Sequence, residues 1–86
     1  MDAHILAVDD NPEIREIIEI LLTGEGFAVD QAGDGTQALA MLKEKHYDLI
    51  ILDIMMPGMN GYQTCLEIRK LTNAPILFLS ARTKRG

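Results

Sequence analysis

The 86-residue sequence has little of several features that define common classes of protein. Its one cysteine, Cys65, excludes an intramolecular disulfide and any zinc cluster built on cysteines. Eight lysine and arginine residues against 13 aspartate and glutamate residues give a net charge of −5, which leaves no basic face for nucleic acid. No apolar run approaches the roughly 18 residues of a membrane span. The acidic start at Asp2 does not fit a signal peptide. These absences predict a cytoplasmic domain that binds neither nucleic acid nor membrane.

What is present suffices for one small folded domain. Hydrophobic residues make up 48% of the chain and charged residues 24%, close to the average of globular domains. A chain of this size buries roughly 60–70% of the surface that its unfolded form exposes, so a core forms but is marginal. We therefore expect residues 1–86 to form one domain, with its function carried by a few particular side chains.

The hydrophobic pattern alternates between strand and helix periods. Apolar segments predict four strands, at His4–Val8, 27–32, 49–54 and Ile76–Leu79. Strands separated by helices form a parallel sheet with right-handed crossovers. The nearly continuous apolar run at 49–54 belongs at the centre of such a sheet, and the alternating segment at 27–32 belongs at an edge. The predicted fold class is α/β, a doubly wound parallel sheet with strand order 2-1-3-4.

Three segments with helical periodicity connect these strands. The first helix begins with Asn11 as its cap and Pro12 at its first position. Its apolar stripe is expected to lie mainly in the core and consists of Ile14, Ile17, Ile18, Leu21 and Leu22. The third helix, at 62–71, is expected to turn three side chains inward, those of Cys65, Leu66 and Ile68.

Three aspartates follow the two strands between which the winding of the sheet reverses. Asp9 and Asp10 end the first strand, and Asp53 lies at the end of the third. In such sheets, ligands bind at the carboxyl ends of the strands beside that reversal. Three carboxylates in one crevice repel one another and resist desolvation, and a divalent cation relieves both effects. An all-oxygen ligand set favours Mg²⁺, or Mn²⁺, over zinc.

A magnesium site of this kind suits phosphoryl transfer. Asp53 interrupts a hydrophobic strand, where an unpaired charge is costly, and is the best candidate for a nucleophile that forms an aspartyl phosphate. Ser80, after the fourth strand, could donate its hydroxyl to a phosphoryl oxygen. In the simpler alternative, Asp10 and Asn11 only cap the first helix and Ser80 is a turn residue. Capping leaves Asp9 and Asp53 unexplained.

Three stretches of the sequence resemble the receiver domain of bacterial two-component response regulators. They are VDDNP at 8–12, DLIILDIMMPGMNG at 48–61 and PILFLSAR at 75–82. The resemblance extends over the whole chain, and the D-x-x-x-P-x-x-x-G spacing in the second stretch is highly specific. The third stretch is most similar to regulators that carry a winged-helix DNA-binding domain. The resemblance implies a flavodoxin-like fold, in agreement with the sheet predicted above.

The resemblance also implies a role for each matching residue of the acidic cluster. Asp53 would accept a phosphoryl group from a sensor histidine kinase and would also contact the metal. Asp10 would bind Mg²⁺ directly, and Asp9 would assist through water. The backbone carbonyl of Met55 would be a further metal ligand.

Two implied roles fall near the end of the chain. The Ser80 hydroxyl would move to the phosphoryl group as a switch, and the backbone N–H of Ala81 would also contact that group. Receivers have five strand–helix units, whereas the match covers three units and one strand. The active-site lysine, the aromatic switch residue, the fifth strand and the last two helices therefore have no counterpart. Lys84 is a weak candidate for the lysine, so we interpret residues 1–86 as the N-terminal portion of a receiver.

The leading hypothesis is a Mg²⁺-dependent aspartyl-phosphate switch that at most catalyses its own phosphorylation and dephosphorylation. One alternative is a fragment that is not phosphorylated and acts only by binding metal or by self-association. A metal-dependent phosphatase with Asp53 as its nucleophile is a third, less favoured hypothesis. Without a fifth strand, the fourth is expected to be an exposed apolar edge that forms a homodimer or a domain-swapped assembly.

Overall fold

Four parallel strands and three helices make up the described part of the chain. The computed structural model describes residues 3–54 and 61–79. The elements in chain order are β1 (His4–Val8), α1 (Pro12–Gly24), β2 (Ala28–Ala32), α2 (Gly35–Glu44), β3 (Leu49–Asp53), α3 (Gly61–Arg69) and β4 (Ile76–Leu79). The strands lie in the order β2-β1-β3-β4, and every pair is parallel. The predicted α/β class and strand order 2-1-3-4 are therefore confirmed.

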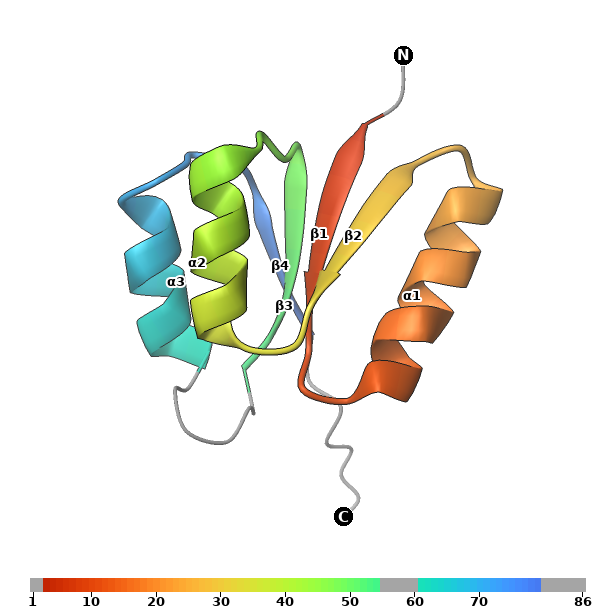
Figure 1. The fold of residues 1–86 in the computed structure, drawn as a ribbon, viewed down its shortest axis with the longest axis horizontal. Helices are drawn as coiled ribbons and strands as arrows, with labels where there is room; N and C mark the ends of the chain where they lie inside the picture. Colours follow the sequence, from red (N-terminus) through yellow and green to blue (C-terminus); the bar gives the residue numbers. More distant parts are fainter. Residues whose placement is uncertain (1–2, 55–60, 80–86) are drawn as a thin grey trace.

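The helices divide between the two faces of the sheet. Figure 1 shows α2 and α3 on one side of the strands and α1 on the other. The main core lies on the side of α2 and α3 and consists of Leu6, Val8, Ala32, Ala38, Tyr47, Ile50, Leu52 and Ile68. Because side chains alternate along a strand, Ile5, Ala7 and Ile51 face the side of α1. The burial of both faces of β3 confirms its predicted central place.

Helix α1 begins as the sequence predicts, but it contributes less to the core. The Asn11 side chain accepts a hydrogen bond from the backbone N–H of Glu13, and Pro12 occupies the first turn. The expectation that the apolar stripe is mainly core is wrong. No residue of α1 is buried, and Ile17 and Leu21 are 52% and 63% exposed. The physical reason is that α1 packs against β2 and β1 at one side of the sheet, so only part of its stripe has a partner.

Helix α3 also differs from its prediction. It ends at Arg69 instead of residue 71, and Leu66, expected to point inward, is 67% exposed. Its buried residues are Gly61, Thr64 and Ile68. These positions lie on one helical face, and Leu66 projects away from it. Two strand boundaries also differ from the prediction by one residue: β2 begins at Ala28 and β3 ends at Asp53.

A polar cluster closes the amino end of the sheet. The Tyr47 hydroxyl donates to Oδ2 of Asp30 at 2.6 Å, and Nζ of Lys45 donates to the same oxygen at 2.9 Å. These two hydrogen bonds, that of Tyr47 first, hold the pKa of Asp30 below its usual value. Burial, and then the bond to Asp30, raises the pKa of Tyr47. The cluster ties the α2–β3 connection to β2, and no local pattern in the sequence predicts it.

Strand β4 forms one edge of the described sheet and pairs with β3. Leu77 is 56% exposed and Phe78 is 45% exposed. The ring of Phe78 lies 6.2 Å from that of Tyr62, which is also exposed. The expected apolar edge is therefore present in the described part of the sheet. Across the described ranges, every helix is too short or too polar to cross a membrane.

Candidate functional site

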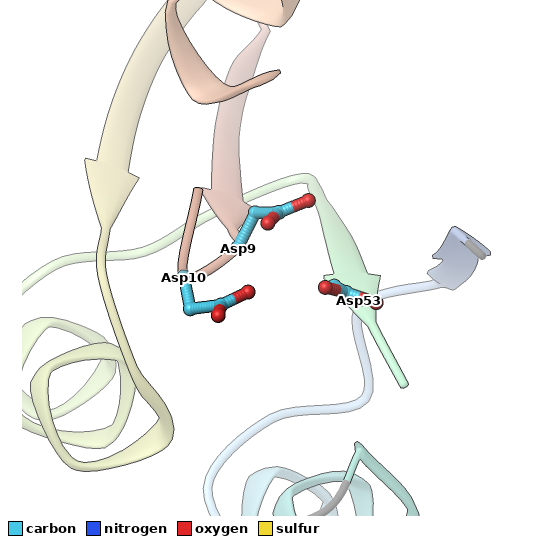
Figure 2. A group of neighbouring side chains, drawn as sticks. All are labelled: Asp9, Asp10 and Asp53. Carbon is cyan, nitrogen blue, oxygen red and sulfur yellow. The ribbon is translucent and has the colours of Figure 1, made fainter. Parts of the chain in front are cut away.

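The structure brings Asp9, Asp10 and Asp53 together at the carboxyl ends of β1 and β3. Each residue offers one carboxylate oxygen, and these oxygens all lie within 4.8 Å of one another. Figure 2 shows Asp10 and Asp53 pointing toward each other, with Asp9 beside them at the end of β1. The convergence follows from topology, because adjacent parallel strands end at the same edge of the sheet.

Asp9 is the most constrained of the three and is 1% exposed. Its backbone N–H donates to the carbonyl oxygen of Ala32 at 3.2 Å. Its Oδ1 accepts a hydrogen bond from the N–H of Asn11 at 2.9 Å. Its Oδ2 is buried and has no hydrogen-bond partner among the described residues. A buried carboxylate oxygen without a partner is costly unless a cation binds it.

The electrostatics of Asp9 agree with this geometry. Burial is the main reason that its pKa lies above the usual value, and repulsion from the carboxylates of Asp53 and Asp10 raises it further. The hydrogen bond from Asn11 opposes these effects only in part. A divalent cation among the three carboxylates would remove both the repulsion and the unsatisfied oxygen.

Asp53 and Asp10 differ in exposure. Asp53 is the last residue of β3 and is 3% exposed, whereas Asp10 is exposed. One side of the cluster is therefore open to solvent, as a metal that keeps several waters requires. His4 and His46 lie by the amino ends of β1 and β3, away from the cluster. The all-oxygen donor set thus fits a hard cation such as Mg²⁺.

Gly61 holds the start of α3 against the end of β3. Its backbone N–H donates to the carbonyl oxygen of Ile54 at 3.3 Å. A Cβ on Gly61 would lie 2.2 Å from Cα of Ile54, closer than atoms can approach. Because Gly61 has no side chain, the first residue of α3 can lie directly against Ile54, the residue that follows Asp53. The signal for this contact in the sequence is the glycine of the D-x-x-x-P-x-x-x-G spacing, a residue to which the resemblance assigns no role.

Several predicted site residues lie outside the described part of the chain. They are Met55, Ser80, Ala81 and Lys84. Their roles remain predictions from the resemblance.

We predict that Asp9→Asn stabilises the metal-free protein. The raised pKa means that folded Asp9 holds its proton to a higher pH than unfolded Asp9 does. Its contribution to the free energy of unfolding therefore falls as pH rises from 3.8 through the raised pKa. At pH 7 with EDTA, we expect the variant to be more stable by about 1 kcal/mol in urea denaturation.

The difference in stability between Asp9→Asn and wild type should disappear below pH 3.8, where Asp9 is protonated in both the folded and the unfolded protein. Asp34→Asn is the matched control, because Asp34 is exposed and caps α2, a position where asparagine serves equally well. Equal stability of Asp9→Asn and wild type at pH 7 would contradict a destabilising charge at Asp9.

A profile of the response regulator receiver domain matches residues 5–85. The chain belongs to this family. Similar curated relatives include the DNA-binding response regulator MtrA of Mycolicibacterium smegmatis, 46% identical over 83 residues, with 96% of this chain and 36% of that protein covered. The transcriptional regulatory protein YrkP of Bacillus subtilis is 48% identical over 83 residues, with the same coverage, 96% and 36%. The chain thus spans about a third of the length of these relatives.

Solved receiver structures share the fold. The response regulator protein TrrA of Thermotoga maritima, in complex with Mg²⁺ and BeF, is 44% identical with a TM-score of 0.86 over 94% of this chain and 71% of that chain. TrrA in complex with the histidine kinase ThkA gives a TM-score of 0.86 and 43% identity over 95% of this chain and 72% of that chain. The receiver fold is flavodoxin-like, as the resemblance implied.

Proposed function

We propose that this receiver chain is a phosphoacceptor in two-component signalling and that Asp53 takes the phosphoryl group from a sensor histidine kinase. The observation that carries the proposal is the meeting of three carboxylates at one edge of the sheet, where a buried oxygen of Asp9 has no hydrogen-bond partner in the described part of the chain. The complex of TrrA with the kinase ThkA supports a kinase as the donor.

In the proposed transfer, a carboxylate oxygen of Asp53 forms a bond to phosphorus. The bond between phosphorus and the donor's imidazole nitrogen breaks, and the leaving imidazole takes up a proton. Asp9, Asp10 and Asp53 would hold Mg²⁺ through their carboxylates, and the backbone carbonyl of Met55 would be a further ligand. When bound, Mg²⁺ supplies positive charge against the phosphoryl oxygens.

This chain's own residues prepare the site for that step. Burial keeps Asp53 at a fixed position at the end of β3, so the reacting oxygen is oriented before the donor arrives. The open side at Asp10 admits the donor. We further propose that the Ser80 hydroxyl and the Ala81 N–H contact the phosphoryl group after transfer, as the resemblance implies.

For the whole protein, we propose a role like that of its relatives. MtrA is named a DNA-binding response regulator, which supports control of transcription by a separate output domain. We propose that residues 1–86 are the N-terminal portion of the receiver, located in the cytoplasm, with no direct contact to nucleic acid. The net charge of −5 agrees with the last point.

The test is phosphoryl transfer from acetyl phosphate, a small donor that needs no kinase. The 86-residue chain is incubated with acetyl phosphate and Mg²⁺, and its intact mass is measured. The proposal requires a single added phosphoryl group that appears with Mg²⁺ or Mn²⁺ and is absent with EDTA. A lack of any adduct, together with measurable Mg²⁺ binding, would show that the acidic cluster alone does not support transfer.

We also propose that the 86-residue chain self-associates through β4, as a homodimer or by exchange of an element. A strand edge with Leu77 56% exposed is a template for pairing with another chain. Size-exclusion chromatography with light scattering should give at least twice the monomer mass, and Leu77→Lys should restore the monomer. Leu66→Lys, on the exposed side of α3, is the matched control and should remain associated. A monomeric wild-type chain would refute the proposal.

A further inference from the structure

A chain of polar contacts on α1 and β2 ends on the backbone of the acidic cluster. The guanidinium of Arg15 donates from Nη1 to the carbonyl oxygen of Asp9 at 2.5 Å. It donates from Nε to Oε1 of Gln31 at 3.0 Å. Nε2 of Gln31 in turn donates to Oε1 of Glu19, one helical turn further along α1. Gln31 of the strand, itself held by Glu19 of the helix, thus fixes the guanidinium of Arg15 against Asp9.

The contact from Arg15 completes a frame around Asp9. The N–H of Asp9 is held by Ala32, and Oδ1 is held by Asn11. With the carbonyl oxygen held by Arg15, the remaining polar atom of Asp9 is Oδ2, which has no partner within residues 3–54 and 61–79. The carbonyl belongs to the planar peptide that joins Asp9 to Asp10. Together with the φ angle of Asp10, the orientation of this peptide sets the direction in which the Asp10 side chain leaves the backbone.

The choice of partner is informative because acidic side chains are available nearby. Arg15 forms no ion pair with any described residue, although Glu16 and Glu19 lie on the same helix. Its charged donors instead contact a neutral carbonyl and a neutral amide. Hydrogen bonds from a charged, planar donor are strong and directional. The arrangement thus serves orientation of the backbone more than pairing of charges.

We infer that Arg15 is a positioning residue that orients the Asp9–Asp10 pair for binding a divalent cation, an inference that rests on the proposed function for its metal. Gln31 fixes the guanidinium by accepting a hydrogen bond from its Nε. Loss of the contact would let the Asp9–Asp10 peptide rotate, so the three carboxylate oxygens would converge less often. Groups that orient metal ligands in this way have large effects on affinity although they do not touch the metal.

The test compares Mg²⁺ affinity in variants of the 86-residue chain by NMR titration. Arg15→Met keeps the apolar stem and removes every donor, and we expect Mg²⁺ to bind about tenfold more weakly. Arg15→Lys keeps the charge without the fork of donors, and we expect about threefold weaker binding. Arg69→Met is the matched control, because Arg69 donates to the backbone carbonyls of Thr72 and Ala74 beyond α3. It should leave Mg²⁺ affinity unchanged.

A second measurement in the metal-free protein separates this inference from the proposed function. Amide hydrogen exchange at Asn11, whose N–H is held by Asp9, should be at least about threefold faster in Arg15→Met. It should not change in Arg69→Met. If the wild type binds no Mg²⁺, the proposed function fails, and this exchange result alone decides whether Arg15 positions the pair.

Two results would overturn the inference. One is an amide exchange rate at Asn11 in Arg15→Met that equals the rate in the wild type. The other is a loss of Mg²⁺ affinity that Arg69→Met reproduces to the same extent, since that would reflect general destabilisation. If circular dichroism shows that Arg15→Met is unfolded, Gln31→Leu replaces it, because this change keeps Arg15 and removes the hydrogen bonds of Gln31 to the guanidinium and to Glu19. Its expected effect is about threefold on affinity, in the same direction.

Discussion

Replacing Asp53 by asparagine is expected to abolish phosphoryl uptake from acetyl phosphate, a loss of more than about a hundredfold, because an amide oxygen is a poor nucleophile. The substitution keeps the size and shape of a side chain that is 3% exposed, so the fold should tolerate it. It also removes one charge from a crowded cluster. Intact-mass spectrometry in the presence of Mg²⁺ should show one phosphoryl group on the wild type and none on the variant.

Asp34→Asn is the matched control for this experiment. Asp34 caps α2 by accepting a hydrogen bond from the N–H of Gln37 at 2.7 Å, and asparagine can accept the same bond. The control should therefore be phosphorylated like the wild type. An adduct that persists in Asp53→Asn would place the phosphoryl group on another side chain and would contradict the assignment of Asp53.

Gly61→Ala should destabilise the chain by about 3 kcal/mol, a large part of the stability of a small domain. The new Cβ would lie 2.2 Å from Cα of Ile54, and at 2.8 Å from both Cβ and Cγ2 of the same residue. Backbone cannot yield as a flexible side chain does, so α3 must move away from the end of β3. Urea denaturation followed by circular dichroism measures the effect.

Gly24→Ala is expected to have the opposite effect on stability. No described residue has an atom within 4 Å of the position that a Cβ on Gly24 would take, and Gly24 is in the last turn of α1. Alanine should there stabilise the helix by about 0.5 kcal/mol. Equal denaturation midpoints for the two variants would show that the contact between Gly61 and Ile54 does not constrain the fold.

The strand order and the meeting of the aspartates could be predicted because each depends on a strong local pattern. The apolar run of β3 requires burial on both faces, which places it at the centre of the sheet. Parallel topology then brings the ends of β1 and β3 to one edge. Asp9, Asp10 and Asp53 converge for this reason, without any detail of side-chain packing.

Other features depend on how the helices are rotated and on contacts distant in sequence. Leu66 satisfies an apolar pattern, but the buried face of α3 is defined by Gly61, Thr64 and Ile68. The contact from Arg15 to Asp9 depends on one rotamer of Arg15, which Gln31 of β2 holds by a hydrogen bond. The bond between Tyr47 and Asp30 joins residues 17 positions apart. No local periodicity encodes such pairs.

The two ends of the sheet have opposite electrostatic character. At the amino end, Asp30 receives hydrogen bonds from Tyr47 and Lys45, and Asp48 receives one from the backbone of His4. At the carboxyl end, like charges gather around an oxygen of Asp9 that no described residue contacts by a hydrogen bond. The carboxyl end is therefore the part of the described sheet whose electrostatic energy is most sensitive to an added cation.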